Sequence, residues 1–406
     1  MSDKAYALFE EQQQARGIRL EEVKNRLKEL KIETPSWGYG DSGTRFKVFQ
    51  KTGVPRNPFE KLEDAAQVHK VTGLCPSVAI HIPWDKVEDY GKLRSHAESL
   101  GLRIGAVNPN LFQDDDYMLG SVTNSDEVIR RKAVGHLLEC VDIAKETGSQ
   151  DLSLWFADGT NYPGQGDIRR RKRWMLEALS EMYKALTPEM RMLIEYKAFE
   201  PAFYHTDIAD WGMAYNYAVK LGPQAAVLVD TGHHLPGANI EHIVAYLIDE
   251  QRLGGFHFNS YKYADDDLIV GSVNPYELFL IFYQILNAAS DEEAAIQSTV
   301  DGIAYMIDQS HNIEQKIPAM IRSVLNVQTQ YAKALLINHD EVADAAGRGD
   351  VLGAEDAVRK AFEFDVTPLL QAVREEQGLP VDPMKAYLSG SYPNDILGRG
   401  KGGASW

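Results

Sequence analysis

Acidic and histidine residues stand at the ends of four apolar runs in the second half of the chain. Glu195 ends Leu193-Ile194, Asp230 ends Val227-Leu228-Val229, His257 follows Gly255-Phe256, and Asp308 follows Met306-Ile307. If these runs are parallel strands of one barrel, their last side chains can converge on one point. Carboxylates with one or two imidazoles suit Mn²⁺, Mg²⁺ or Co²⁺ better than a structural zinc site, which would use thiolates.

The segment Asp265-Asp266-Asp267 adds two carboxylates, those of Asp265 and Asp267, that face one way in an extended chain. Carboxylates held together repel each other unless a cation lies between them. We therefore predict two divalent metals. One is expected on Glu195, Asp230, His257 and Asp308, and the other on His233, Asp265 and Asp267, with Asp230 or Glu195 bridging.

Each of these residues has an ordinary structural explanation when it is taken alone. An Asp after a strand is more often a helix N-cap or a loop residue than a ligand, by roughly three to one. A lone His233 or His257 is more often a satisfied core or surface histidine, and the Asp265–Asp267 run is usually a solvated turn. Their occurrence together at the same end of successive strands favours a site.

Aromatic side chains and one lysine accompany the acids. Trp37 and Trp155 end two predicted strands, and carbohydrate C–H faces pack against such rings, whereas Trp84 is equally compatible with core packing. Lys197 lies two residues after Glu195 and therefore on the same side of the strand. No glycine-rich phosphate loop adjoins these residues, so an unphosphorylated polyol fits better than a sugar phosphate.

The elements that must position these residues alternate between strand and helix. From Trp37 to Asp308 the chain advances 271 residues over seven steps, about 39 per step, which is the size of a βα unit. No Gly-x-Gly-x-x-Gly follows a strand, so the pattern favours a (β/α)₈ TIM barrel of the α/β class over a dinucleotide-binding sheet. The predicted strands are Ser36–Gly40, Ser77–Ile82, Arg103–Asn108, Asp151–Phe156, Met190–Lys197, Ala225–Thr231, Gly254–Asn259 and Ala304–Asp308.

Both ends of the chain read as helical additions to the barrel. Residues 5–32 carry Leu20, Val23 and Leu27 on one face before Thr34 and Pro35 stop the helix. After Asp308 we predict helices at 317–337, 340–348, 354–362 and 366–376, and a glycine-rich tail from Gly390 that is mobile or contacts another subunit. The expected division is 1–34, an N-terminal helical segment, 35–315, the catalytic barrel, and 316–406, the C-terminal extension.

Charge and cysteine content exclude several classes of partner. The 406 residues include 42 Lys and Arg against 59 Asp and Glu, a net charge of −17, which repels nucleic acid and anionic membrane surfaces. Two cysteines, Cys75 and Cys140, indicate a reducing compartment. The N-terminal residues lack the apolar stretch of a secretory signal, and the longest apolar segment is too short to span a membrane. A cytoplasmic protein is expected.

Five motifs resemble those of the L-rhamnose isomerases. They are Glu-Tyr-Lys-Ala-Phe-Glu-Pro (195–201), Val-Asp-Thr-Gly-His-His (229–234), His-Phe-Asn-Ser (257–260), Ala-Asp-Asp-Asp-Leu-Ile-Val-Gly (264–271) and Asp-Gln-Ser-His-Asn (308–312). The resemblance implies a xylose isomerase-like barrel, two divalent metals per subunit, usually Mn²⁺, and a homotetramer. Glu195, Asp230, His257 and Asp308 match the structural-metal ligands, and His233, Asp265 and Asp267 match the catalytic-metal ligands.

The resemblance also assigns roles around the metals. Lys197 matches a lysine that polarises or protonates the substrate oxygen, His81 matches a histidine that assists ring opening, and Asp267 is the third expected catalytic residue. Trp37, Trp155 and Phe46 resemble aromatic pocket residues, and in some members the loop that holds the last of these comes from a neighbouring subunit.

The expected activity is aldose–ketose isomerisation of L-rhamnose and L-rhamnulose by a metal-assisted 1,2-hydride shift. L-Mannose, L-lyxose, D-allose and D-ribose are alternative substrates, because one hydroxyl or methyl group changes discrimination by only about 1–3 kcal/mol. Two alternatives stay open: a metal-dependent sugar epimerase of the same barrel class, and a non-catalytic, metal-stabilised sugar-binding module.

Overall fold

Eight parallel strands close into a barrel in the computed structural model, which describes residues 2–41, 48–198, 205–262 and 266–402. The strands follow one another around the barrel in chain order, and β1 pairs with β10 to close it. This arrangement confirms the predicted (β/α)₈ barrel. Its strands are β1 (Glu33–Pro35), β2 (Ser77–Ile82), β3 (Arg103–Pro109), β4 (Asp151–Leu154), β6 (Arg191–Glu195), β8 (Ala225–Asp230), β9 (Leu253–Phe258) and β10 (Ala304–Ile307).

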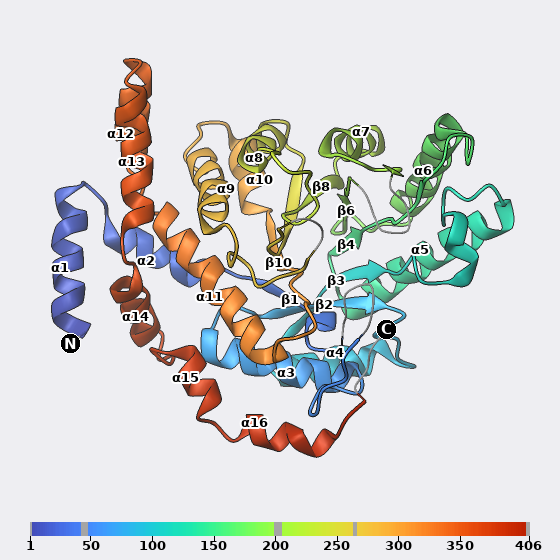
Figure 1. Ribbon diagram of the computed structural model, residues 1–406, viewed down its shortest axis with the longest axis horizontal. Helices are drawn as coiled ribbons and strands as arrows, with labels where there is room; N and C mark the ends of the chain where they lie inside the picture. Colours follow the sequence, from blue (N-terminus) through green and yellow to red (C-terminus); the bar gives the residue numbers. More distant parts are fainter. Residues whose placement is uncertain (1, 42–47, 199–204, 263–265, 403–406) are drawn as a thin grey trace.

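Helices lie outside the strands and cover them (Figure 1). Four of them begin at an aspartate whose carboxylate accepts a backbone N–H of the first turn: Asp89, Asp126, Asp167 and Asp210. Such caps contribute about 1 kcal/mol each. The outer helices are α3 (Pro58–Thr72), α4 (Tyr90–Ser99), α5 (Glu127–Thr147), α6 (Ile168–Tyr183), α7 (Trp211–Leu221), α8 (Ile240–Asp249), α9 (Pro275–Ala288), α10 (Ala294–Asp301) and α11 (Lys316–Ala334).

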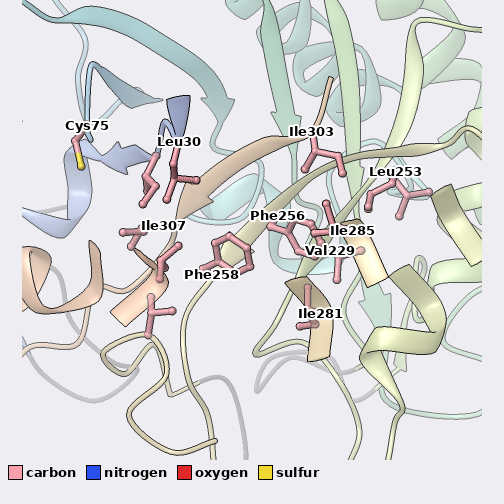
Figure 2. Close-up of a cluster of buried hydrophobic side chains, with 14 of the residues drawn as sticks. Leu30, Cys75, Val229, Leu253, Phe256, Phe258, Ile281, Ile285, Ile303 and Ile307 are labelled. Carbon is pink, nitrogen blue, oxygen red and sulfur yellow. The ribbon is translucent and has the colours of Figure 1, made fainter. Parts of the chain in front are cut away.

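Side chains on each strand alternate between the helix layer and the barrel interior. Figure 2 shows Phe256 and Phe258 of β9 in the outer core, near Val229 of β8 and Ile285 of α9. The rings of Phe256 and Phe258 stack with their centroids 4.9 Å apart. Because successive strand residues point to opposite sides, His257 between them points into the barrel. The apolar residues of the strand thus fix the direction of the histidine.

A small apolar plug fills the barrel interior below the functional residues. It consists of Ala79, Ala106, Leu193, Leu228 and Met306, all buried, and it packs against Trp37 of the mouth. Two positions further along their strands stand His81 after Ala79, Glu195 after Leu193, Asp230 after Leu228 and Asp308 after Met306. Because strand side chains alternate in direction, these four polar side chains also point into the barrel. They lie above the plug, toward the carboxyl ends of the strands.

The ends of the chain differ in part from the prediction. The predicted strand 36–40 is wrong: β1 ends at Pro35, and Ser36–Gly38 forms a 3₁₀ turn. A Cβ on Gly38 would lie 3.1 Å from the carbonyl oxygen of Gln309, so the turn packs closely against the segment after β10. The predicted helix 5–32 is two helices, α1 (Ser2–Ala15) and α2 (Leu20–Glu29), separated at Gly17, whose φ is +77°.

The C-terminal helices agree with the prediction. They are α12 (His339–Gly347) and α13 (Val351–Glu363), which pack against each other and project from the barrel, and then α14 (Thr367–Glu376), which packs against α1 (Figure 1). Beyond them, α15 (Pro383–Leu388), α16 (Tyr392–Asp395) and the 3₁₀ turn η3 (Ile396–Arg399) run past α3. In the described part of the chain, no helix combines the length and apolar character that crossing a bilayer requires.

Candidate active site at the carboxyl ends of the barrel strands

Each of the eight barrel strands contributes to a continuous ring of side chains at the barrel mouth. Four neighbouring aromatic pairs build one half: Trp37–His81 (5.5 Å between centroids), His81–Phe112 (5.8 Å), Phe112–Trp155 (4.7 Å) and Trp155–His233 (6.4 Å). Carboxylates and imidazoles build the other half, from His233 through Glu195 and His257 to Asp308. The ring closes where the indole N–H of Trp37 donates to Asp308. The mouth thus has an aromatic side after β1–β4 and an acidic side after β6–β10.

Glu195 links two imidazoles at the centre of the acidic side. Its Oε1 lies 3.1 Å from Nδ1 of His233, and its Oε2 lies 3.3 Å from Nδ1 of His257. Burial alone would raise the pKa of Glu195, but His257 and His233 lower it to about 2. Burial would likewise lower the pKa of His257, but the carboxylates of Glu195, Asp308 and Asp230 raise it to about 9. The site strongly favours positive charge among these carboxylates.

Asp230 is common to two groups of side chains that could hold a cation. The first consists of Glu195, Asp230 and His233, and the second of Asp230, His257 and Asp308; within each, the ligand atoms lie within 4.8 Å of one another. Buried carboxylate oxygens with one imidazole per group suit a hard or borderline divalent cation. Nδ1 of His257 is buried, and its one described polar contact, Oε2 of Glu195 at 3.3 Å, lacks hydrogen-bond geometry, so the atom is available to a metal. The donor set fits the predicted divalent cations.

Asn259 connects Asp230 to Asp267 and carries a role that sequence reasoning did not assign to it. Its Nδ2 donates to Oδ1 of Asp230 at 3.1 Å and to Oδ1 of Asp267 at 3.3 Å. A Cβ on Gly232 would lie 2.6 Å from Oδ1 of Asn259. Gly232 therefore allows a close approach of this amide.

Asp267 reaches the site through an uncommon backbone conformation. Its φ is +47°, which few non-glycine residues adopt outside constrained sites. The backbone N–H groups of Ser310 and His311 donate to its carbonyl oxygen at 3.3 and 3.2 Å. The loop after β10 thereby holds Asp267 beside the acidic side. Asp265 and Phe46, two further predicted site residues, lie outside the described residues.

His81 stands at the end of β2 within the aromatic side. Its ring stacks on Trp84 at 3.7 Å, and its backbone N–H donates to the buried carboxylate of Asp85 at 2.8 Å. Asp85 also pairs with Nζ of Lys61 at 2.6 Å and accepts from the Ser36 hydroxyl. Burial, followed by the charge of Lys61, lowers the pKa of His81 well below its usual value. His81 is therefore a neutral imidazole at neutral pH.

Lys197 lies over Trp155, the aromatic residue that neighbours His233. The side chain is buried, and its Nζ lies 4.9 Å from the centroid of the Trp155 ring. A cation over an aromatic face gains electrostatic stabilisation, which helps to hold the ammonium in a buried position. Phe112, which completes the aromatic side against Trp155, was missed from the sequence, where its only signal is an aromatic residue shortly after a predicted strand.

Comparison with known proteins decides the family. A family model described as "Xylose isomerase-like TIM barrel" matches residues 64–277. The chain belongs to this family. A protein of Rhizobium meliloti (strain 1021) named "Probable sugar isomerase" is 43% identical over 382 residues, 93% of this chain and 88% of that protein. A protein of the same description from Mesorhizobium japonicum is 39% identical over 395 residues, 96% of this chain and 90% of that one.

More distant similarities extend to proteins with named activities. A xylose isomerase of Thermus thermophilus is 24% identical over 253 residues, 56% of this chain and 65% of that protein. The crystal structure of a D-allulose 3-epimerase from Methylomonas sp. superposes with a TM-score of 0.54 at 15% identity, covering 74% of this chain and 98% of that one. At that identity the likeness shows the fold alone.

Proposed function

We propose that the protein is a metal-dependent aldose–ketose isomerase of unphosphorylated sugars, with L-rhamnose as the leading substrate. The observation that carries the proposal is the division of the barrel mouth into an aromatic side and an acidic side, with Lys197 over Trp155, the aromatic residue that neighbours His233. A sugar can place C–H faces on the rings and its hydroxyl and carbonyl oxygens toward the acidic side. The relatives named "Probable sugar isomerase" support the same class of reaction.

Two divalent cations are proposed on the acidic side, with Mn²⁺ as the leading metal and Co²⁺ or Mg²⁺ as alternatives. Glu195, Asp230 and His233 would hold one, and Asp230, His257 and Asp308 the other, so that Asp230 bridges. Asp267 is proposed to complete the first set together with Asp265. A divalent cation there supplies Lewis-acid polarisation of the carbonyl and hydroxyl oxygens of an open-chain sugar.

The chain's own residues are proposed to supply positioning and proton transfer. The positive Nζ of Lys197 donates a hydrogen bond to the sugar oxygen on which negative charge develops. His81, neutral at this site, can take the proton of the C1 hydroxyl of the closed sugar and deliver it to the ring oxygen as the ring opens. Trp37, Trp155 and Phe46 are proposed as the aromatic contacts of the sugar. Hydrogen then moves with its electron pair from C2 to C1, while the O2 proton passes to O1.

An epimerase is the second candidate, favoured by the fold shared with sugar epimerases. An epimerase typically places two acids about the substrate carbon. Among the described residues, Glu195, Asp230 and Asp308 all belong to the two candidate cation groups, and the other side of the mouth is aromatic. This distribution supports the isomerase over the epimerase.

An NMR time course in D₂O with Mn²⁺ and several aldoses tests the proposal. L-Rhamnulose should form from L-rhamnose without deuterium at C1; deuterium incorporation at the rate of turnover would contradict the hydride shift. A product inverted at one carbon would indicate an epimerase, and unchanged sugar bound only with Mn²⁺ would indicate a binding module. Lys197→Met should abolish turnover while Mn²⁺ stays bound. Lys24→Met, which removes a buried lysine paired with Glu376 far from the mouth, is the control.

The resemblance also leads us to propose a homotetramer in the cytoplasm. Sedimentation equilibrium of the full chain measures its assembly, and a monomer would contradict this proposal.

A further inference from the structure

A buried arginine joins three loops of the barrel mouth. Arg171 of α6 is 4% exposed, and its guanidinium forms a fork with the Asp207 carboxylate through Nε (3.1 Å) and Nη2 (2.8 Å). The remaining N–H groups donate to carbonyl oxygens of Leu119 (3.4 Å) and Thr123 (3.2 Å), after β3, and of Gly159 (3.0 Å), after β4. Asp207 itself follows β6. One side chain therefore fixes the β3, β4 and β6 loops relative to one another.

A second buried carboxylate completes this cluster. Asp158 accepts the backbone N–H groups of Ser121 and Thr123, each at 2.9 Å, and both of their hydroxyls. The Thr123 hydroxyl also lies 2.8 Å from Asp207. A Cβ on Gly120, whose φ is +107°, would lie 3.1 Å from Nη2 of Arg171, so the loop closes tightly around the guanidinium. Two carboxylates and one guanidinium therefore lie together, with all three side chains almost entirely buried.

The segment that carries Asp207 is bonded directly to the backbone of Lys197. The Lys197 N–H donates to the carbonyl of Ile208 at 3.0 Å, and the Thr206 hydroxyl donates to the carbonyl of Lys197. Asp207 is the residue between Thr206 and Ile208 in the sequence. Its own N–H donates at 2.8 Å to the carbonyl of Asp158, where β5 (Gly159–Thr160) pairs with β7 (His205–Thr206).

The same cluster also fixes the ring over which the lysine lies. Trp155 precedes Asp158 by three residues on the β4 loop, and Nζ of Lys197 lies 4.9 Å from its centroid. Arg171 therefore joins the loop of the lysine to the loop of the tryptophan. We propose that Arg171 and Asp207 form a positioning pair that sets Lys197 over Trp155 and toward the acidic side; the reaction it serves rests on the proposed function.

The geometry of the pair explains why an arginine stands here. The planar guanidinium makes a two-point contact with Asp207 and still donates to carbonyls of two other loops, whereas a lysine ammonium is a point charge on a flexible stem. A displacement of about 1 Å at a reacting group can cost about 100-fold in rate. Replacement of Arg171 by lysine should keep the charge and the fold, but it should hold the three loops less firmly relative to one another.

Arg171→Lys and Asp207→Asn test the proposal in the full chain with Mn²⁺. We expect kcat to fall at least about 10-fold, with Mn²⁺ affinity unchanged and KM changed less than kcat. Acetylation of Lys197 by acetic anhydride, followed by peptide mass spectrometry, should be at least a few-fold faster than in the parent. The control is Arg131→Lys, which removes an exposed fork to Glu181 at 2.7 and 2.8 Å on the α5–α6 surface.

The outcomes separate this inference from the proposed function. Unchanged kcat and an unchanged Lys197 acetylation rate in either folded variant would overturn the positioning pair. If the parent turns over none of the aldoses, the proposed function fails, but the acetylation rates still decide whether the pair positions Lys197. If Arg171→Lys does not fold, Asp207→Asn, which keeps the size of the side chain and its contact with Thr123, decides alone.

Discussion

Nε1 of Trp37 donates a hydrogen bond to Oδ1 of Asp308 over 2.8 Å, across 271 residues of sequence. The pairing of β1 with β10 brings the two segments together at the point where the barrel closes. Trp37 therefore does more than provide an aromatic face: it orients a carboxylate of the second candidate cation group. Partners that orient a metal ligand also tune the affinity for the metal.

Trp37→Phe keeps an aromatic ring and removes this hydrogen bond. We expect Mn²⁺ affinity or turnover to fall by about 10- to 100-fold, because the Asp308 carboxylate loses its orienting donor. Isothermal titration with Mn²⁺ measures the affinity. Trp84→Phe is the matched control, since its indole donates at 2.6 Å to Gln113 instead. Equal Mn²⁺ affinity in Trp37→Phe and the parent would show that the bond to Asp308 does not orient a ligand.

Removal of metal should lower the melting temperature. A cation that binds only the folded chain stabilises it by about 2.7 kcal/mol when its free concentration is 100 times Kd. Thermal melts with Mn²⁺ and with EDTA measure the difference, and readdition of Mn²⁺ should restore the higher value. Asp230→Asn, which weakens both candidate groups, should melt at the same temperature in Mn²⁺ and EDTA. A parent protein insensitive to EDTA would contradict the metal assignment.

The sequence predicted the residues that depend on local periodicity. Glu195, Asp230, His257 and Asp308 stand two positions beyond interior residues of their strands, so the alternation alone places them at the mouth. Local periodicity does not predict every contact of these residues. The position of Trp37 near the site was predicted, but its hydrogen bond to Asp308 depends on closure of the barrel.

The residues that were missed depend on contacts between loops. Arg171 and Asp207 lie on different connections, and nothing in their local sequence relates them to Lys197. Phe112 enters the aromatic side only because the loop after β3 folds back toward Trp155. Such contacts are set by tertiary packing, so periodicity and motif spacing could not reveal them.

Lys316 at the start of α11 should make stability depend on pH. Its Nζ donates to the carbonyls of Ser310 and His311 at 3.3 and 2.9 Å. Burial, and after it the charge of Lys51, lowers the pKa of Lys316 to about 7, although Glu314, Asp41 and Asp267 oppose the shift. Between that pH and about 10.4, the unfolded chain binds a proton that the folded chain does not, so the free energy of unfolding rises with pH in this window.

Lys316→Met should remove this rise. Each pKa unit corresponds to about 1.4 kcal/mol, against about 1 kcal/mol for each lost hydrogen bond, so the variant should be the more stable protein at pH 7 and lose that advantage toward pH 10. Denaturant unfolding in EDTA across this range gives the difference. Lys145→Met, at an exposed position of α5, controls for the loss of one charge. A constant difference between variant and parent would contradict the buried amine.

The glycine-rich tail is held on the barrel along its described part, to residue 402. Nη1 of Arg399 lies 2.8 Å from Oδ1 of the buried Asp64 of α3 and 3.2 Å from the carbonyl of Gly53, and the Tyr392 hydroxyl donates to Asp64 at 2.7 Å. The N–H of Gly53 donates at 2.8 Å to the carbonyl of Gly400. The tail thus secures the loop after β1, which meets the barrel mouth where the Phe49 N–H donates to Asn312.

Arg399→Met should destabilise the protein by about 3 kcal/mol at pH 7.5, because it leaves Asp64 as a buried charge without its cation. Arg359→Met removes an exposed arginine of α13 with three carboxylates within 3.5 Å, and should destabilise the protein much less than Arg399→Met, because solvent screens exposed ion pairs. Burial raises the pKa of Asp64 to about 6, so at pH 5 the carboxyl binds a proton and the loss in Arg399→Met should shrink. Denaturant unfolding at both pH values measures these changes. Equal losses in the two variants at pH 7.5, or a loss in Arg399→Met that does not change with pH, would mean that the tail is not held through Asp64.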